Sequence, residues 1–235
     1  MKVGIIGTRG IARAHLRWGQ GDLQDQSVEV VAAAGIVPGR AAEVAERCGV
    51  PYPFEDCSRI LEMSEIEAVD ICTCNQAHRQ PTVDALEAGK HVLVEKPMAT
   101  FLDDAVAMAR AARRVGKILM CGIKSRYSSE WIAARKFARS GMLGDIYYVQ
   151  ASGGHRRGVP GRTFLRKGSA GGGIVVDGGV HTIDNVTWVM GHPKQVNRFS
   201  FTTRCSIAAM DVCQVASWQT SCHTGSRSAK PGLAR

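Results

Sequence analysis

The sequence predicts an α/β fold in which a doubly wound parallel sheet is followed by an incomplete α+β domain with an open sheet. Apolar runs of strand length alternate with longer helix-like stretches, and glycines interrupt the chain where many of these segments end. Such alternation indicates right-handed crossovers and a parallel sheet. We expect a first domain at residues 1–122 and a second at residues 123–235.

The first expected strand, residues 2–7, runs into a glycine turn and a helix-like stretch at residues 11–16. In dinucleotide-binding folds the first glycine of this turn makes the tight bend, and a small third residue lets the helix pack on the strand. Gly7 and Ala12 match these two places, whereas Arg9 stands where the second glycine is expected. The candidate cofactor residues in this loop are Gly7, Thr8, Arg9, Gly10, Ile11 and Ala12.

A second strand is expected at residues 28–34, and an acidic residue at its end would bind a ribose 2′-hydroxyl. Gly35 occupies that position. Two explanations are open. The site prefers a 2′-phosphorylated cofactor, with Arg9 or Arg40 as counter-cation, or the cofactor site is partly degraded. We favour the first slightly, so that NADP is preferred over NAD.

The later elements continue the alternation. Strands are expected at residues 68–72, 91–94 and 117–121, and helices at residues 81–88 and 102–115, which Gly89 and Gly116 close. In the longer helix Ala105, Met108 and Ala112 recur at helical spacing, so one face is buried and the other faces water.

Glu95, Lys96 and Pro97 follow the strand expected at residues 91–94. They therefore lie at the carboxyl end of a parallel strand, where open α/β sheets bind ligands. Pro97 fixes its own backbone and restricts that of Lys96. Taken alone, the tripeptide could also be a charged turn in which Pro97 opens the next helix.

Four motifs occur in the order found in a known enzyme family. They are residues 7–15, residues 73–78 (Thr-Cys-Asn-Gln-Ala-His), the Glu95-Lys96-Pro97 tripeptide and residues 177–184 (Asp-Gly-Gly-Val-His-Thr-Ile-Asp). From residue 1 to about residue 203 the chain resembles the Gfo/Idh/MocA oxidoreductases. The resemblance implies a Rossmann domain, a second domain whose open sheet often forms a dimer interface, and NAD- or NADP-dependent chemistry on a sugar, cyclitol or related polyol.

By this resemblance, Lys96 is the catalytic lysine that hydrogen-bonds the reacting hydroxyl, and Asp177 and His181 face it from the second domain. An ordinary imidazole, with a pKa of about 6.5, exchanges protons near neutral pH, so His181 is the acid/base candidate. A cationic lysine would stabilise the developing alkoxide. Asp177, His181 and Asp184 are four and three residues apart, so on a helix they would share one face. Without the other motifs they read as a helix cap, a core histidine and a surface charge.

The same resemblance implies the other site residues. Further cofactor contacts are expected from Thr73, Asn75, His78, Glu95 and Lys96, and substrate contacts from Lys96, Arg126, Tyr127, Asp177 and His181. Asn75 and His78 would line the nicotinamide side, with an Asx-type turn and a helix start as the alternative readings. Cys74 replaces a proline usual in the family, which loosens the turn but removes no polar group. Arg126 and Tyr127 read equally well as a surface cation beside a packed ring.

A basic cluster precedes Asp177 and is followed by Gly171, Gly172 and Gly173, where backbone could approach a ligand. The cluster comprises Arg156, Arg157, Arg162, Arg166 and Lys167. It would form part of a substrate lid or bind an anionic group of the substrate, with solvated charge as the default.

Composition excludes several classes of protein. The 30 basic and 21 acidic side chains give a net charge of +9, but no nucleic-acid-binding module accompanies it. No apolar run is long enough for a membrane span, and no secretory leader is evident, so we expect a cytoplasmic protein. The eight cysteines lack metal-ligand spacing, so reduced thiols and no metal are expected.

Beyond about residue 203 the strand alternation fades, and we expect a poorly packed tail from about residue 205. Because family members continue well beyond this length, the chain reads as truncated. A partial sheet would expose strand edges, which puts the homo-oligomers of intact family members in question here. The leading hypothesis is an NAD(P)-dependent oxidoreductase. Its alternatives are a catalytically silent nucleotide- or sugar-binding relative and an inactive truncated remnant.

Overall fold

The computed structural model describes residues 1–17, 27–155, 173, 175–191, 198–206 and 209–219. They belong to two units. The first comprises Met1–Lys124 and Val159–Val180, and the second comprises Ser125–Gly158 and His181–Arg235. No helix among the described residues is both long enough and apolar enough to cross a membrane.

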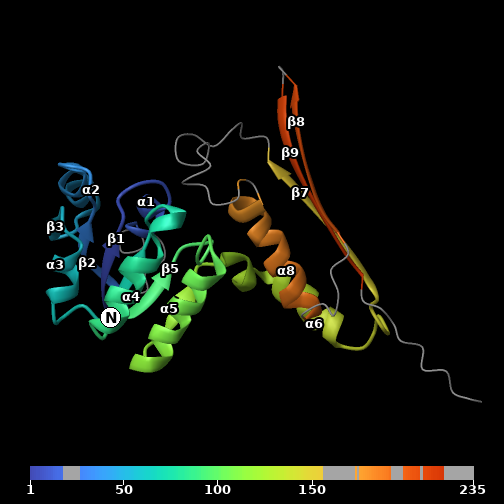
Figure 1. The fold of residues 1–235 in the computed structure, drawn as a ribbon, viewed down its shortest axis with the longest axis horizontal. Helices are drawn as coiled ribbons and strands as arrows, with labels where there is room; N and C mark the ends of the chain where they lie inside the picture. Colours follow the sequence, from blue (N-terminus) through green and yellow to red (C-terminus); the bar gives the residue numbers. More distant parts are fainter. Residues whose placement is uncertain (18–26, 156–172, 174, 192–197, 207–208, 220–235) are drawn as a thin grey trace, which may run out of the picture. The chain divides into compact units, whose positions relative to one another are not determined.

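A six-stranded parallel sheet forms the centre of the first unit (Figure 1). Its strands are β1 (Lys2–Ile6), β2 (Glu29–Ala34), β3 (Tyr52–Phe54), β4 (Ala68–Ile71), β5 (His91–Val94) and β6 (Leu119–Cys121). The order β3-β2-β1-β4-β5-β6 reverses direction between β1 and β4, which creates the crevice where such sheets bind nucleotides. The predicted doubly wound parallel sheet is confirmed.

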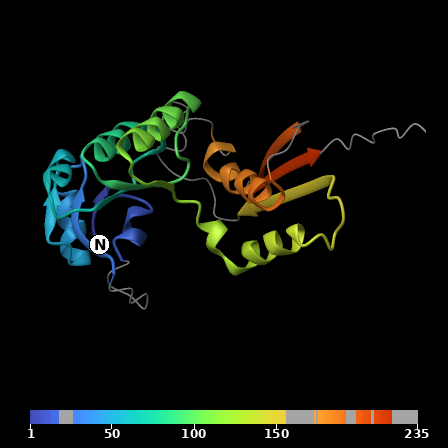
Figure 2. The same ribbon diagram turned by 90° about the horizontal axis from the view of Figure 1, so that it is seen from below.

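Helices cover both faces of this sheet (Figure 2). One face packs against α1 (Ala12–His15) and α2 (Arg40–Cys48), and the other against α3 (Ser58–Glu62), α4 (Arg79–Glu87) and α5 (Leu102–Val115). Strand side chains alternate between the two cores, since Ile5 joins the core beneath α1 and Ile6 the core beneath α4 and α5. Both faces are apolar because both are covered.

The second unit contains an antiparallel sheet and two helices. The strands β7 (Tyr148–His155), β8 (Arg198–Ser206) and β9 (Ala209–Gln219) pair in the order β7-β9-β8. Its helices are α6 (Ser129–Arg139) and α8 (Val180–Met190). Val186 of α8 is buried against Val149 and Ala151 of β7, and the Arg135 guanidinium of α6 lies 4.4 Å from the ring centroid of Trp188.

The backbone near the carboxyl end differs from the fading alternation that the sequence predicts beyond about residue 203. Strand β8 continues to Ser206, and β9 pairs with β8 from Ala209 to Ser217 and with β7 from Val212 to Gln219. Val212, Val215 and Trp218 are among the β-branched and aromatic residues that favour this strand, although the polar residues between them blur its period. Residues 220–235, the rest of the expected tail, lie outside the described residues.

Candidate functional site

The loop after β1 has a backbone that only glycine fits at its first position. Gly7 has a φ of +113°, and a Cβ there would lie 2.5 Å from the backbone oxygen of Cys72. Its N–H donates to the carbonyl of Ala34 at 2.8 Å, so the loop passes close to both neighbouring strands. Gly10 also has a positive φ, and Ala12 is fully buried where α1 meets the sheet. These features match the tight turn and close helix packing of a dinucleotide loop.

Thr8 occupies the space beside Gly35, where an acidic residue was considered. A Cβ on Gly35 would lie 2.5 Å from Thr8 Oγ1, and Thr8 is only 4% exposed. The packing of Thr8 therefore leaves no space for an aspartate or glutamate side chain at position 35. Of the two proposed counter-cations, Arg9 is exposed, whereas Arg40 Nη1 contacts Glu43 at 2.7 Å.

The loop after β4 holds one buried amide and one buried imidazole. Asn75 is 8% exposed, and its Nδ2 has no hydrogen-bond partner among the described residues. A buried donor of this kind calls for a ligand or water. His78 is 1% exposed, with Nδ1 2.8 Å from the carbonyl of Pro97 and Nε2 3.3 Å from that of Thr73.

Burial lowers the pKa of His78 despite these carbonyls, so the ring is neutral at physiological pH. His78 thus ties the loop after β4 to the turn at Pro97, and its direct contact with a cofactor stays a prediction. Thr73 is engaged locally, since its hydroxyl donates to the carbonyl of Ala77 at 3.1 Å.

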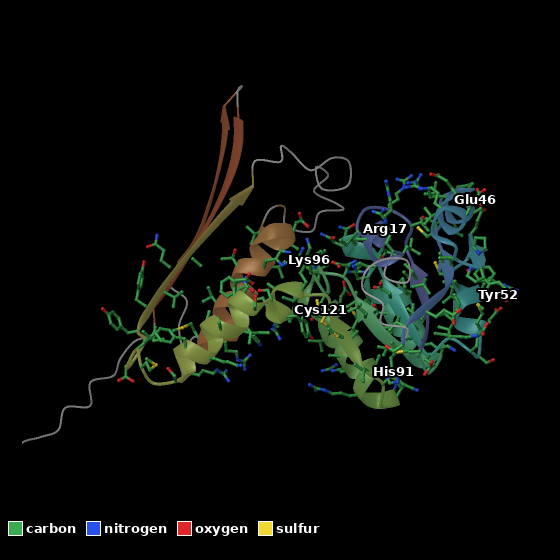
Figure 3. All side chains as sticks on the ribbon, turned by 180° about the vertical axis from the view of Figure 1, so that it is seen from behind. Arg17, Glu46, Tyr52, His91, Lys96 and Cys121 are labelled. Carbon is green, nitrogen blue, oxygen red and sulfur yellow. The ribbon has the colours of Figure 1, made fainter. Side chains whose placement is uncertain are left out.

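Lys96, labelled in Figure 3, follows β5, as predicted. A cis peptide bond joins it to Pro97. Its Nζ donates to Asp177 Oδ1 at 2.9 Å and to the Asp177 carbonyl at 3.0 Å. The two side chains are 23% and 21% exposed. The structure therefore joins two predicted site residues that lie far apart in the sequence. These contacts use two of the three ammonium donors, and the third can serve a ligand.

The helical segment around Asp177 differs from the single face that the sequence predicts. Val175–Gly179 forms a π-helical turn, and α8 begins only at Val180. Because a π turn has a different period from an α-helix, the four-residue spacing of Asp177 and His181 does not place them on one α-helical face. His181 and Asp184 lie on α8 in the second unit, whereas Asp177 belongs to the first.

Arg126 is paired within the second unit. Its Nε donates to Asp184 Oδ2 at 2.7 Å and its Nη2 to the other carboxylate oxygen, a bidentate arrangement. Tyr127 beside it is 68% exposed. The substrate contacts expected of both residues stay predictions. The basic cluster at residues 156, 157, 162, 166 and 167, together with Gly171 and Gly172, lies outside the described residues.

A polar cluster at Glu95 brings in three buried residues that are not among the predicted site residues, His15, Asp70 and Cys72. His15 on α1 contacts Asp70 of β4, Cys72 just after β4, and Glu95 just after β5. Burial disfavours the charged imidazole, but the hydrogen bonds with Asp70 and Glu95 outweigh it and raise the pKa of His15 to about 9. Burial also raises the pKa of the Cys72 thiol, which stays protonated. The available signal was Asp70, an acid inside an otherwise apolar strand, which needs a buried partner.

Comparison with known proteins agrees with this geometry. Residues 1–123 match the model of the oxidoreductase family with an NAD-binding Rossmann fold, and residues 131–220 match the Gfo/Idh/MocA C-terminal domain. The chain belongs to the Gfo/Idh/MocA oxidoreductase family. The predicted resemblance is therefore confirmed.

Several known dehydrogenases are similar to the chain. It is 34% identical over 205 residues to D-glucoside 3-dehydrogenase of Escherichia coli (strain K12), covering 86% of this chain and 58% of that protein. It is 30% identical over 164 residues to scyllo-inositol 2-dehydrogenase (NAD⁺) of Bacillus subtilis (strain 168), covering 69% of this chain and 46% of that protein. The chain thus spans about half the length of these relatives.

Solved structures of the family share the fold. Levoglucosan dehydrogenase in complex with NADH and levoglucosan matches with a TM-score of 0.70 and 26% identity, over 88% of this chain and 58% of that one. GenD2 from gentamicin A biosynthesis, in complex with NAD, matches with a TM-score of 0.76 at 22% identity, over 94% of this chain and 65% of that one, which shows the fold alone.

Proposed function

We propose that this member of the Gfo/Idh/MocA family transfers a hydride between a nicotinamide cofactor and a hydroxyl or keto carbon of a sugar, cyclitol or related polyol. The observation that carries the proposal is the contact of Lys96 Nζ with Asp177 beside the carboxyl end of β5. Relatives whose names specify glucoside and inositol dehydrogenation support the substrate class.

The described residues fit a dinucleotide. The backbone at Gly7 excludes a side chain, and Asn75 Nδ2 is a buried donor without a partner among the described residues. Residues Gly7 to Ala12 would hold the pyrophosphate, and Thr73, Asn75 and Glu95 would lie toward the nicotinamide. When bound, the nicotinamide accepts the hydride during oxidation of an alcohol or donates it during reduction of a carbonyl.

We assign the proton chemistry to three side chains. In the oxidative direction, His181 removes the proton from the substrate hydroxyl, while Lys96 Nζ donates a hydrogen bond to the same oxygen as negative charge develops. Asp177 orients the ammonium and keeps its charge balanced before the substrate binds. In reduction the same groups act in reverse, and His181 returns the proton to the oxygen.

The cofactor preference is part of the proposal. We propose that NADP binds more tightly than NAD, because no carboxylate stands at Gly35 to repel a 2′-phosphate and Arg9 is an exposed cation in the adjoining loop. NAD and NADH in the solved relatives belong to those proteins and leave this preference to be measured.

The proposal is tested by replacing Lys96 with methionine. Turnover should first be sought with both cofactors on a panel of glucosides, inositols and levoglucosan. On a confirmed substrate, Lys96→Met should lower kcat by about a hundredfold or more and leave the cofactor Kd nearly unchanged, since the lost contact matters most in the transition state. Lys136→Met, on an exposed position of α6, is the matched control.

Two outcomes would count against the enzyme. Unchanged turnover in Lys96→Met would refute the assigned role of the lysine. Cofactor binding without turnover on any polyol would instead favour a catalytically silent nucleotide-binding relative, the alternative that the sequence leaves open.

A further inference from the structure

His15 connects the Gly7–Ala12 loop to the segment after β5 that carries Lys96. It lies on α1, directly after the Gly7–Ala12 loop, and is 7% exposed. Its Nδ1 is 2.7 Å from Asp70 Oδ2, and its Nε2 is 3.3 Å from Glu95 Oε1. One side chain of α1 therefore contacts carboxylates associated with two neighbouring strands.

The contacts of His15 with two carboxylates, which raise its pKa, favour a proton on each ring nitrogen. Ionised carboxylates only accept hydrogen bonds, and an imidazole donates from both nitrogens only when it is cationic. Cys72 is a further titratable group facing the ring, and its Sγ lies 3.3 Å from Nδ1 and 3.6 Å from Asp70 Oδ1. The thiol is neutral and can donate to Asp70, so His15 supplies the positive charge beside the buried Asp70 and the partly buried Glu95.

A metal ion fits this cluster less well than a proton. His15, Asp70 and Cys72 offer ligand atoms within 4.8 Å of one another. Two ligand atoms of a tetrahedral zinc ion with bonds of about 2.0 Å would lie about 3.3 Å apart. The observed 2.7 Å between Nδ1 and Oδ2 is instead the length of a charge-assisted hydrogen bond.

Glu95 contacts both His15 and the backbone of Lys96. Its Oε2 accepts the backbone N–H of Lys96 at 2.9 Å, while Oε1 faces His15. On its other side Gly122 leaves room for the carboxylate, because a Cβ there would lie only 3.3 Å from Oε1. Both oxygens of Glu95 are thus engaged, one by the ring of His15 and one by the peptide that carries the lysine.

We propose that His15 is a positioning residue, which fixes Glu95 and through it the backbone from which the Lys96 ammonium projects. The inference deepens the proposed function and rests on it, because a fixed ammonium matters only if Lys96 meets the substrate oxygen. A displacement of about 1 Å in a reacting group can cost about a hundredfold in rate.

Two variants of His15 separate positioning from plain stabilisation. An asparagine amide reaches the place of Nδ1 and keeps the contact with Asp70, whereas the longer glutamine amide reaches the place of Nε2 and keeps the contact with Glu95. His15→Asn should lower kcat by about tenfold to a hundredfold, and His15→Gln should recover most of it. Val44→Ala, in the same apolar core as α1, controls for lost stability alone.

A second measurement does not need turnover. The lysines are dimethylated with ¹³C-formaldehyde, and the Lys96 signal is assigned by its absence in Lys96→Met. This signal should move in His15→Asn and stay in place in His15→Gln and Val44→Ala. In the unmodified protein it should also show an inflection at the pH where the ¹⁵N signals of the His15 ring titrate.

The outcomes are distinguishable. If Lys96→Met keeps full turnover, the proposed function fails, while the NMR signal still reports whether His15 positions the lysine. If His15→Asn folds and leaves both kcat and the Lys96 signal unchanged, the positioning role is overturned. If that variant does not fold, the pH titration of the unmodified protein tests the proposal. A Lys96 signal with no inflection where the His15 ring titrates would overturn it.

Discussion

The charge of His15 makes the stability of the protein depend on pH. Its pKa is about 9 in the folded chain, against about 6.5 for an unperturbed histidine, because the hydrogen bonds with Asp70 and Glu95 outweigh the effect of burial. A group that holds its proton more tightly when folded contributes its full stabilisation below the unfolded pKa. That contribution is lost as the pH rises through the folded pKa.

We therefore expect the free energy of unfolding to fall between pH 6.5 and pH 9, by up to about 3 kcal/mol for a shift of this size. Urea unfolding under reducing conditions at a series of pH values measures it. Above pH 6.5 the separate effect of His78, whose pKa burial lowers, is avoided. The same series on His15→Gln should be much flatter, and an equally steep fall there would assign the effect to another group.

Local pattern predicts Lys96 and its strand but not the cluster around His15. Lys96 stands directly after an apolar run, so its place at the end of β5 follows from neighbouring residues. His15 lies on α1, Asp70 on β4 and Glu95 just after β5, and no spacing in the sequence relates them. Only the topology of the parallel sheet brings them together.

Among the elements, those with long uninterrupted patterns are predicted best. Strand β5 and helix α5 begin and end at the predicted residues, because α5 has a clear apolar stripe and Gly116 adopts the left-handed conformation at its end. No element is predicted between residues 36 and 67, where the structure has α2, β3 and α3. Strand β3 has only three residues, one of them Pro53, and lies at the edge of the sheet. It forms a strand because it pairs with β2, and its own residues carry no strand pattern that could have predicted it.

The turn after β2 offers a test of cofactor preference at the level of the element. Gly35→Asp would introduce the acidic residue that NAD-binding folds often carry at this position. The distance from its Cβ to Thr8 Oγ1 would be only 2.5 Å, which is a steric clash. We expect the single variant to lower the melting temperature and to bind either cofactor weakly. Thr8→Gly combined with Gly35→Asp should recover stability by removing the collision.

The unmodified protein should bind NADPH more tightly than NADH, and the double variant should reverse that order. A charge-assisted contact with phosphate is worth about 1.5–3 kcal/mol, which corresponds to about a tenfold to hundredfold change in Kd. Nicotinamide fluorescence measures all four constants, and Thr8→Gly alone is the control. Tighter binding of NADH by the unmodified protein would refute the preference for NADP.

At the scale of the whole molecule, buried apolar side chains are distributed unevenly. Of those that the structure describes, all except Val186 belong to the first unit. There, two cores enclose the central sheet from both faces, whereas the described core of the second unit consists of Val186 and its partly buried neighbours. Local stability follows the density of buried contacts, so the two units should open with different free energies.

Hydrogen exchange followed by mass spectrometry should therefore find the slowest amides in β1, β4 and β5 and faster exchange in α6 and β7. The difference should be about a hundredfold or more in protection, which corresponds to about 2.7 kcal/mol of opening free energy. NADPH should slow exchange further in the loops after β1, β4 and β5, because a ligand stabilises the state that it binds. If exchange in α6 and β7 is instead as slow as in β1, the two units open together. The second unit would then contribute to the stability of the first.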